Sequence, residues 1–68
     1  MTQLGEWLKQ EGRLQRWVAQ RMGVHPSAVN RWVAGTRRPN SHQALALEEL
    51  TSGMVPVTSW DASPIVQL

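Results

Sequence analysis

The sequence predicts an all-α fold of four to five short helices followed by a short extended tail. Apolar residues recur at helical spacing through the first fifty residues. Glycine follows each of the first three apolar stretches, at Gly12, Gly23 and Gly35, where it favours the end of a helix. A chain of 68 residues buries only about 60% of the surface of its unfolded form, so one domain with a small core is expected.

Two helices are expected before Gly23. The first lies between Thr2, a suitable N-cap, and Gly12, with the apolar face Leu4, Trp7 and Leu8. The second is expected over residues 14–22, where four apolar residues form one stripe: Leu14, Val18, Ala19 and Met22. Trp17 falls off this stripe, so it is expected either to cover the first helix or to meet a partner.

Two more helices are expected before residue 53. The third begins near His25, because Pro26 suits the first helical position, and its apolar residues are Val29, Trp32 and Val33. Residues 36–40 are expected as a loop, since Pro39 disfavours helical geometry in the residue before it. Ser41 is the expected cap of a fourth helix, which runs over 42–50.

The tail, residues 54–68, is expected to lie outside the domain formed by residues 1–53. Val55 and Val57 alternate with other residues, which favours a strand. Pro56 stands between them and cannot donate to a ladder, so only an edge or isolated strand is expected. A short turn of helix over 59–62 is the alternative, and residues 64–68 are expected to fray.

Charge is unevenly distributed along the chain. Residues 1–38 carry all seven basic side chains and two acidic ones, a net charge of +5. Residues 39–68 carry three acidic side chains and no Lys or Arg, a net charge of −3. The basic half suits binding to a polyanion, and the acidic half suits a different function. A solvated surface of uneven charge is an equal alternative.

Several classes of protein are excluded by the residue types present. There is no cysteine, and His25 and His42 lie far apart without a third ligand, so neither a disulfide nor a metal site is expected. No nucleophile–base pair or phosphate-binding glycine loop is present, so we expect no enzyme, cofactor or small-molecule substrate. No apolar run reaches the ~20 residues that span a bilayer, and no signal peptide is visible, which favours the cytoplasm.

The segment from Gln15 to Val33 predicts two helices that meet across a tight turn. A small residue, Ala19, permits close approach of the helices, and Gly23 accommodates a positive φ. Val24 is expected to fill the corner, while Val29 and Trp32 pack back onto the second helix. The opposite face of the third helix is polar and is therefore free to enter a major groove: His25, Ser27, Asn30 and Arg31.

This segment resembles phage Cro and repressor-like helix-turn-helix proteins, and GVHPSAVNRWVAG is especially similar to Cro. The resemblance covers residues 15–35 and extends more loosely over the first helix and residues 39–57. It implies a lambda repressor-like domain that binds a double-stranded DNA operator, in a bacterial cytoplasm and of phage or prophage origin. The end of the chain is similar to small Cro-like and antitoxin-type regulators.

The resemblance also implies roles for individual residues. Five of them match positions that face base edges: His25, Pro26, Ser27, Asn30 and Arg31. Gln15 matches a position that contacts phosphate or supports the reading helix, and Arg37 and Arg38 match a loop along the DNA backbone. Arg16 is a further candidate for phosphate contact, with a solvated helix surface as the alternative. The family often has Gln where Pro26 stands, and Pro offers only apolar contact.

One such module touches few base pairs, so a homodimer that spans half-sites ~34 Å apart is expected. The tail is the expected contact between subunits, through Met54, Val55, Val57 and Trp60, although packing of Trp60 within the monomer is equally open. Two rival hypotheses remain. One is an antitoxin-type regulator that binds a toxin through its acidic half, and the other is a protein-interaction module that no longer binds DNA.

Overall fold

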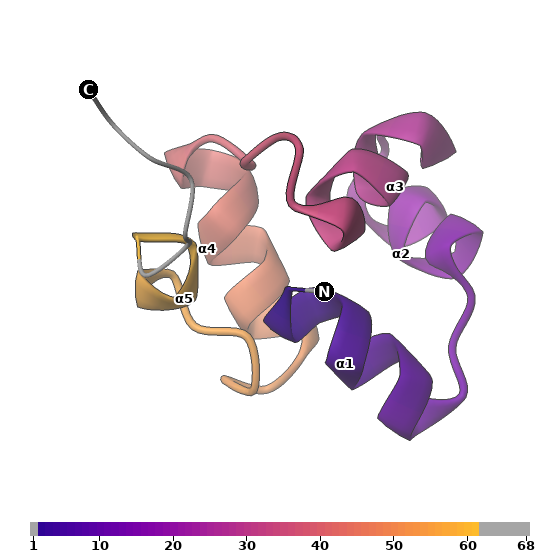
Figure 1. Ribbon diagram of the computed structural model, residues 1–68, viewed down its shortest axis with the longest axis horizontal. Coiled ribbons are helices and arrows are strands. Elements are labelled where there is room, and N and C mark those ends of the chain that lie inside the picture. Colours follow the sequence, from indigo (N-terminus) through magenta and orange to yellow (C-terminus); the bar gives the residue numbers. More distant parts are fainter. Residues whose placement is uncertain (1, 62–68) are drawn as a thin grey trace.

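The computed structural model describes residues 2–61, and these residues form five helices and no strand (Figure 1). The helices are α1 (Gln3–Glu11), α2 (Gln15–Met22), α3 (Pro26–Ala34), α4 (Ser41–Leu50) and α5 (Thr58–Asp61). The predicted all-α fold is therefore confirmed. The predicted fraying of residues 64–68 lies outside the described residues, as does residue 62 of the predicted final helical turn.

All five helices contribute to one hydrophobic core. In Figure 1, α1, α2 and α3 gather on one side of the molecule, and α4 and α5 on the other. The third helix is central, because it packs against both α1 and α2. The buried apolar residues come from every helix and from the segment before α5: Leu4, Leu8, Val18, Ala19, Val29, Trp32, Ala44, Leu47, Val55 and Trp60.

The turn between α2 and α3 has the geometry that its sequence predicts. Gly23 follows α2 with φ of 70°, in the left-handed region that favours glycine. The N–H of Val24 donates to the carbonyl of Ala19 at 3.0 Å, which is the long bond of a Schellman motif. Val24 also packs against the core. The chain therefore leaves α2 along a fixed direction and enters α3.

The predicted start of α2 was one residue too early. Leu14 is not helical; it is the N-cap residue, with extended backbone angles (φ −90°, ψ 150°). Its carbonyl accepts the first bonds of the helix, from the N–H groups of Trp17 and Val18. Its side chain is 59% exposed and so does not belong to the buried stripe. An apolar residue at a helical interval was mistaken for a core position.

The C-terminal end of α3 is fastened by the residue that precedes α1. The Thr2 hydroxyl donates to the carbonyl of Trp32 at 2.9 Å and lies 3.3 Å from that of Val33. The N–H of Thr2 also donates to the Val33 carbonyl, at 3.2 Å. Thr2 was predicted to cap α1, and it occupies that position, but its hydroxyl makes no cap bond there. Carbonyls at the end of α3 are satisfied instead.

The fourth helix begins one residue earlier than predicted, and Asn40 rather than Ser41 is its cap. The Asn40 side chain accepts from the N–H of Gln43 at 2.8 Å, and the Gln43 side chain accepts from the N–H of Asn40 at 3.0 Å. These reciprocal bonds form a capping box. Ser41 is the first helical residue because the side-chain carbonyl of Asn40 accepts from the third helical N–H, that of Gln43.

The predicted strand over Val55 and Val57 is wrong. Ser52 and Gly53 both have positive φ and reverse the chain after α4. The N–H of Val55 then donates to the buried hydroxyl of Thr51 at 3.0 Å, and that of Val57 donates to the carboxylate of Glu48 at 3.1 Å. These two N–H groups are satisfied by one side chain of α4, Glu48, and by its C-cap residue, Thr51, so the segment needs no strand partner. The alternative prediction of a short helical turn over 59–62 is correct in type, because α5 lies at 58–61.

Trp17 covers α1, which was one of its two predicted positions. Its ring lies 6.2 Å from that of Trp7, centroid to centroid, at a tilt of 32°. The guanidinium of Arg13 sits over the same ring at 4.3 Å, a favourable cation–π geometry. The two rings therefore join α1 to α2.

Candidate nucleic-acid interface

One face of α3 is buried and the other presents polar groups to solvent. Val29 and Trp32 lie in the core. The five residues predicted to read bases are all exposed: His25, Pro26, Ser27, Asn30 and Arg31. The predicted orientation of the helix is therefore correct, and these side chains are available to an external partner.

The exposed face of α3 is linked to the first turn of α2. The Asn30 side-chain amide donates to Oε1 of Gln15 at 3.2 Å. Gln15 therefore supports the third helix, one of its two predicted roles. Because Oε1 accepts this bond, the side-chain NH2 of the Gln15 amide is left to donate elsewhere. Asn30 keeps its side-chain carbonyl and its second amide N–H. Both amides thus have a fixed orientation and spare hydrogen-bonding capacity.

The N-terminus of α3 is capped by a histidine. Nδ1 of His25 accepts the N–H of Ser27 at 3.1 Å and lies 2.9 Å from the Ser27 hydroxyl. Pro26 occupies the first helical position, as predicted, and brings no unpaired N–H. His25 is thus the N-cap residue of α3, and its ring remains exposed.

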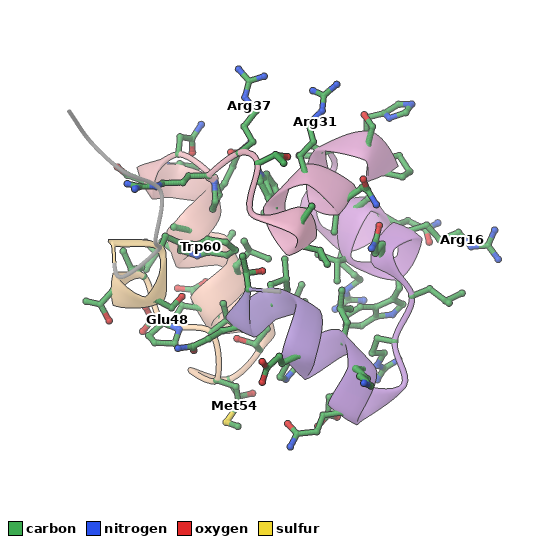
Figure 2. All side chains as sticks on the ribbon, in the orientation of Figure 1. Arg16, Arg31, Arg37, Glu48, Met54 and Trp60 are labelled. Atoms are coloured by element: carbon green, nitrogen blue, oxygen red, sulfur yellow. The ribbon has the colours of Figure 1, made fainter. Side chains whose placement is uncertain are left out.

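A basic cleft lies between α3, the following loop and α4. Its volume is about 320 Å³, and its walls include Arg31, Arg37 and Arg38 together with Asn40 and Gln43. No acidic residue lines it. Figure 2 shows that Arg31 and Arg37 project from the same side of the molecule. Arg37 is exposed and Arg38 half-buried, so this surface offers several donors to an anion.

Arg16 lies at a second hollow, between α2 and α3. This hollow, of about 300 Å³, is formed by α2 and the start of α3, and Arg16, Gln20 and Pro26 are among its lining residues. Arg16 is exposed and points away from the body of the protein (Figure 2). Arg16 and Pro26 therefore border one surface, and the Gln15–Asn30 bond connects the same two helices.

Comparison with known proteins decides what this arrangement is. The model of the helix-turn-helix family matches residues 4–51, which is more than half of the chain. The chain belongs to the helix-turn-helix family. This is a family of DNA-binding regulators rather than of enzymes, so the protein is a helix-turn-helix regulator that binds double-stranded DNA. No curated protein and no solved structure matches the chain.

The helix-turn-helix protein exposes little of its predicted dimer contact within residues 2–61. Val55 and Trp60 are 0% and 5% exposed and belong to the core of the monomer, and Val57 is half-buried. Met54 is 61% exposed. In Figure 2 it projects from the side opposite Arg31 and Arg37. Packing within the monomer, the alternative for Trp60, is therefore observed.

Two residues of the helix-turn-helix surface were missed from the sequence. Asn40 and Gln43 line the basic cleft, and the capping box that holds them in place was visible as the spacing Asn-x-x-Gln. Among the described residues, no cluster of His, Asp or Glu is arranged to hold a metal ion. None of the described helices is long and apolar enough to cross a membrane.

Proposed function

We propose that this helix-turn-helix protein is a sequence-specific repressor that occupies operator half-sites as a two-fold dimer, with α3 in the major groove. The observation that carries the proposal is the exposed polar face of α3, on which Asn30 is held in place by Gln15. A groove about 12 Å wide admits one helix, and an oriented amide on that helix can distinguish base pairs.

Asn30 and Arg31 are the proposed base readers with the strongest chemistry. Asn30 retains a carbonyl acceptor and one N–H donor, the pair that matches N6 and N7 of adenine. Arg31 is exposed beside it and suits O6 and N7 of guanine. Ser27 suits either a donor or an acceptor, and Pro26 offers apolar contact to a thymine methyl group.

Phosphate contacts are proposed for the residues around the reading helix. The free amino group of Gln15 and the exposed guanidinium of Arg16 lie at the first turn of α2. Arg37 and Arg38 lie in the basic cleft between α3, the following loop and α4. Contacts from α2 and from this cleft fix the register of α3 on the duplex without carrying sequence information themselves.

A dimer is proposed because one α3 helix spans only a few base pairs. Two copies related by a two-fold axis place two reading helices one helical turn apart, ~34 Å. Met54 is the residue of the predicted contact that is available for this purpose, since it is exposed and lies away from Arg31 and Arg37 (Figure 2). A contact through Met54 leaves Arg31 and Arg37 of both copies outside the interface.

Selection of duplexes from a random pool tests the proposal. The wild-type chain is expected to enrich a palindrome whose half-sites lie one turn apart. Asn30→Ala serves as the matched control, because the residue is exposed and its loss removes one reader without opening the core. Enrichment of no common sequence by the wild type, at low salt as well as at physiological salt, contradicts sequence-specific regulation. Enrichment of a single half-site contradicts only the dimer.

A further inference from the structure

The capping bond of α3 fixes the tautomer of His25. A backbone N–H can only donate, so Nδ1, which accepts from the N–H of Ser27 at 3.1 Å, carries a lone pair. In the neutral ring the proton must then lie on Nε2. The Ser27 hydroxyl lies 2.9 Å from Nδ1, and with Nδ1 unprotonated the hydroxyl can only be the donor of that contact. Nδ1 of the imidazole is therefore occupied by the first turn of α3.

The other side of the ring is available. Within residues 2–61, both hydrogen bonds of the His25 ring involve Nδ1, and Nε2 has no partner. The side chain is exposed at the start of the helix that carries the base-reading face. Its backbone is extended (φ −72°, ψ 142°) and is held there by Pro26, because the residue before proline disfavours helical angles. The ring is therefore a donor of defined orientation.

We propose that His25 reads the DNA through Nε2–H, which donates to an acceptor atom on the duplex while Nδ1 caps α3. The inference rests on the proposed function and adds which partner donates the hydrogen bond: His25 donates and the DNA accepts. The matching atoms are N7 or O6 of a purine, O4 of thymine, or a phosphate oxygen. Cytosine presents only an amino donor in the major groove, so it is rejected where the contact is to a base.

Two substitutions separate the two nitrogens. Asparagine places an acceptor where Nδ1 stands and is a favoured N-cap residue, but it does not reach as far as Nε2. Glutamine places an amide near Nε2 and provides no such cap. His25→Asn is therefore expected to keep the melting temperature and to lose affinity. His25→Gln is expected to lose about 4–8 °C in melting temperature and to keep most of the affinity.

The tautomer is measured on the free protein, without any DNA. Nitrogen NMR of the two imidazoles is expected to give an unprotonated Nδ1 and a protonated Nε2 for His25. His42, an exposed residue in the first turn of α4, serves as the internal reference. A protonated Nδ1 in the neutral ring of His25 overturns the inference whatever the DNA results are.

Binding is measured with the duplex that the wild-type chain selects from the random pool. His25→Asn is expected to bind it about three- to tenfold more weakly, the effect of one hydrogen bond. Every base pair of the duplex is then varied in turn for both proteins. Loss of discrimination at one position assigns the acceptor to a base. If the variant binds every duplex equally more weakly, and a methylphosphonate at one linkage abolishes the difference between variant and wild type, the acceptor is a phosphate oxygen.

Three results of the binding experiments also overturn the inference. Equal affinity of His25→Asn and wild type for the selected duplex removes the contact while leaving the proposed function intact. Weakening that follows neither a base position nor a linkage shows that the loss is indirect. Failure of the wild type to select any duplex removes the proposed function, and the reading role of His25 with it.

Discussion

Gln15 and Asn30 are joined by a hydrogen bond of 3.2 Å between exposed faces of α2 and α3. The bond links the first turn of one helix to the middle of the next, so neither amide is oriented independently. If Asn30 reads a base and Gln15 contacts a phosphate, the position of the protein on the DNA backbone is coupled to its recognition of the base. Removal of either amide then affects both contacts.

Asn30→Ala is expected to weaken binding to the selected duplex by about 1–3 kcal/mol, the discrimination that one bidentate base contact provides. Binding to a duplex of unrelated sequence should fall less, because the phosphate contacts of other residues dominate there. Titrations on the two duplexes at one salt concentration provide the measurement. Equal losses on both would place Asn30 outside base recognition.

The coupling of the two amides is measured by a double-mutant cycle. Gln15→Ala, Asn30→Ala and the double variant are expected to be non-additive by about 0.5 kcal/mol or more in binding free energy, since the two side chains share a bond. Isothermal titration of the four proteins against the selected duplex gives the value. Additive losses would mean that the bond is not retained on DNA.

Arg37→Ala is expected to weaken binding to all duplexes and to reduce the dependence of log K on log salt by about 0.9, the value for one phosphate contact. Arg37 is exposed at the rim of the basic cleft, so its truncation leaves the core intact. Arg37→Lys is the control, because it keeps the charge and should keep the slope. An unaltered slope in Arg37→Ala would remove this residue from the DNA contact.

Gly23→Ala is expected to destabilise the protein by about 1 kcal/mol, because φ at this position is 70° and a Cβ disfavours that conformation. An added Cβ meets no atom within 4 Å, so the cost arises from the backbone and not from a clash. Thermal unfolding measures it. Gly23→Asn should cost less, since Asn tolerates this region better. Equal loss for both variants would indicate a steric cause.

Thr51→Val is expected to destabilise the protein by about 1–3 kcal/mol, because it leaves the buried N–H of Val55 without its acceptor. The hydroxyl also donates to the carbonyl of Leu47 at 2.8 Å. Thr51→Ser keeps both bonds and should retain most of the stability. Denaturant unfolding of the two variants gives the comparison, and equal stabilities would deny the hydroxyl its bridging role.

Met54→Lys is expected to weaken self-association at least about tenfold, since it removes a large apolar side chain from the proposed contact. Leu14→Lys is the matched control, because Leu14 is nearly as exposed, 59% against 61%, at the start of α2. Sedimentation equilibrium measures both. If Leu14→Lys dissociates the dimer and Met54→Lys does not, the contact lies at the start of α2.

The sequence was sufficient for the features that depend on local chemistry. Helical spacing and the glycines that follow the helices predicted α1 to α3, and Pro26 marked the start of the third helix. The exposure of its polar face followed from the burial of Val29 and Trp32. These features were predictable because periodicity and backbone preference act over a few residues.

Tertiary contacts decided the features that were missed. Nothing in the sequence indicates that Thr2 fastens the end of α3, because its partners are about thirty residues away. The strand expected at Val55 and Val57 fails because Thr51 and Glu48 supply the acceptors that a neighbouring strand would have supplied. Burial of Trp60 likewise depends on how the last segment returns to α4.

The exposed position of Ser27, Asn30 and Arg31 means that the residues proposed to recognise DNA are separate from those that hold the fold together. During evolution, target preference can change at these three sites with little penalty in folding. His25 is different, because any replacement there must also accept the N–H of Ser27. Variation among descendants of this protein should accordingly be free at the three sites and restricted to capping residues at the fourth.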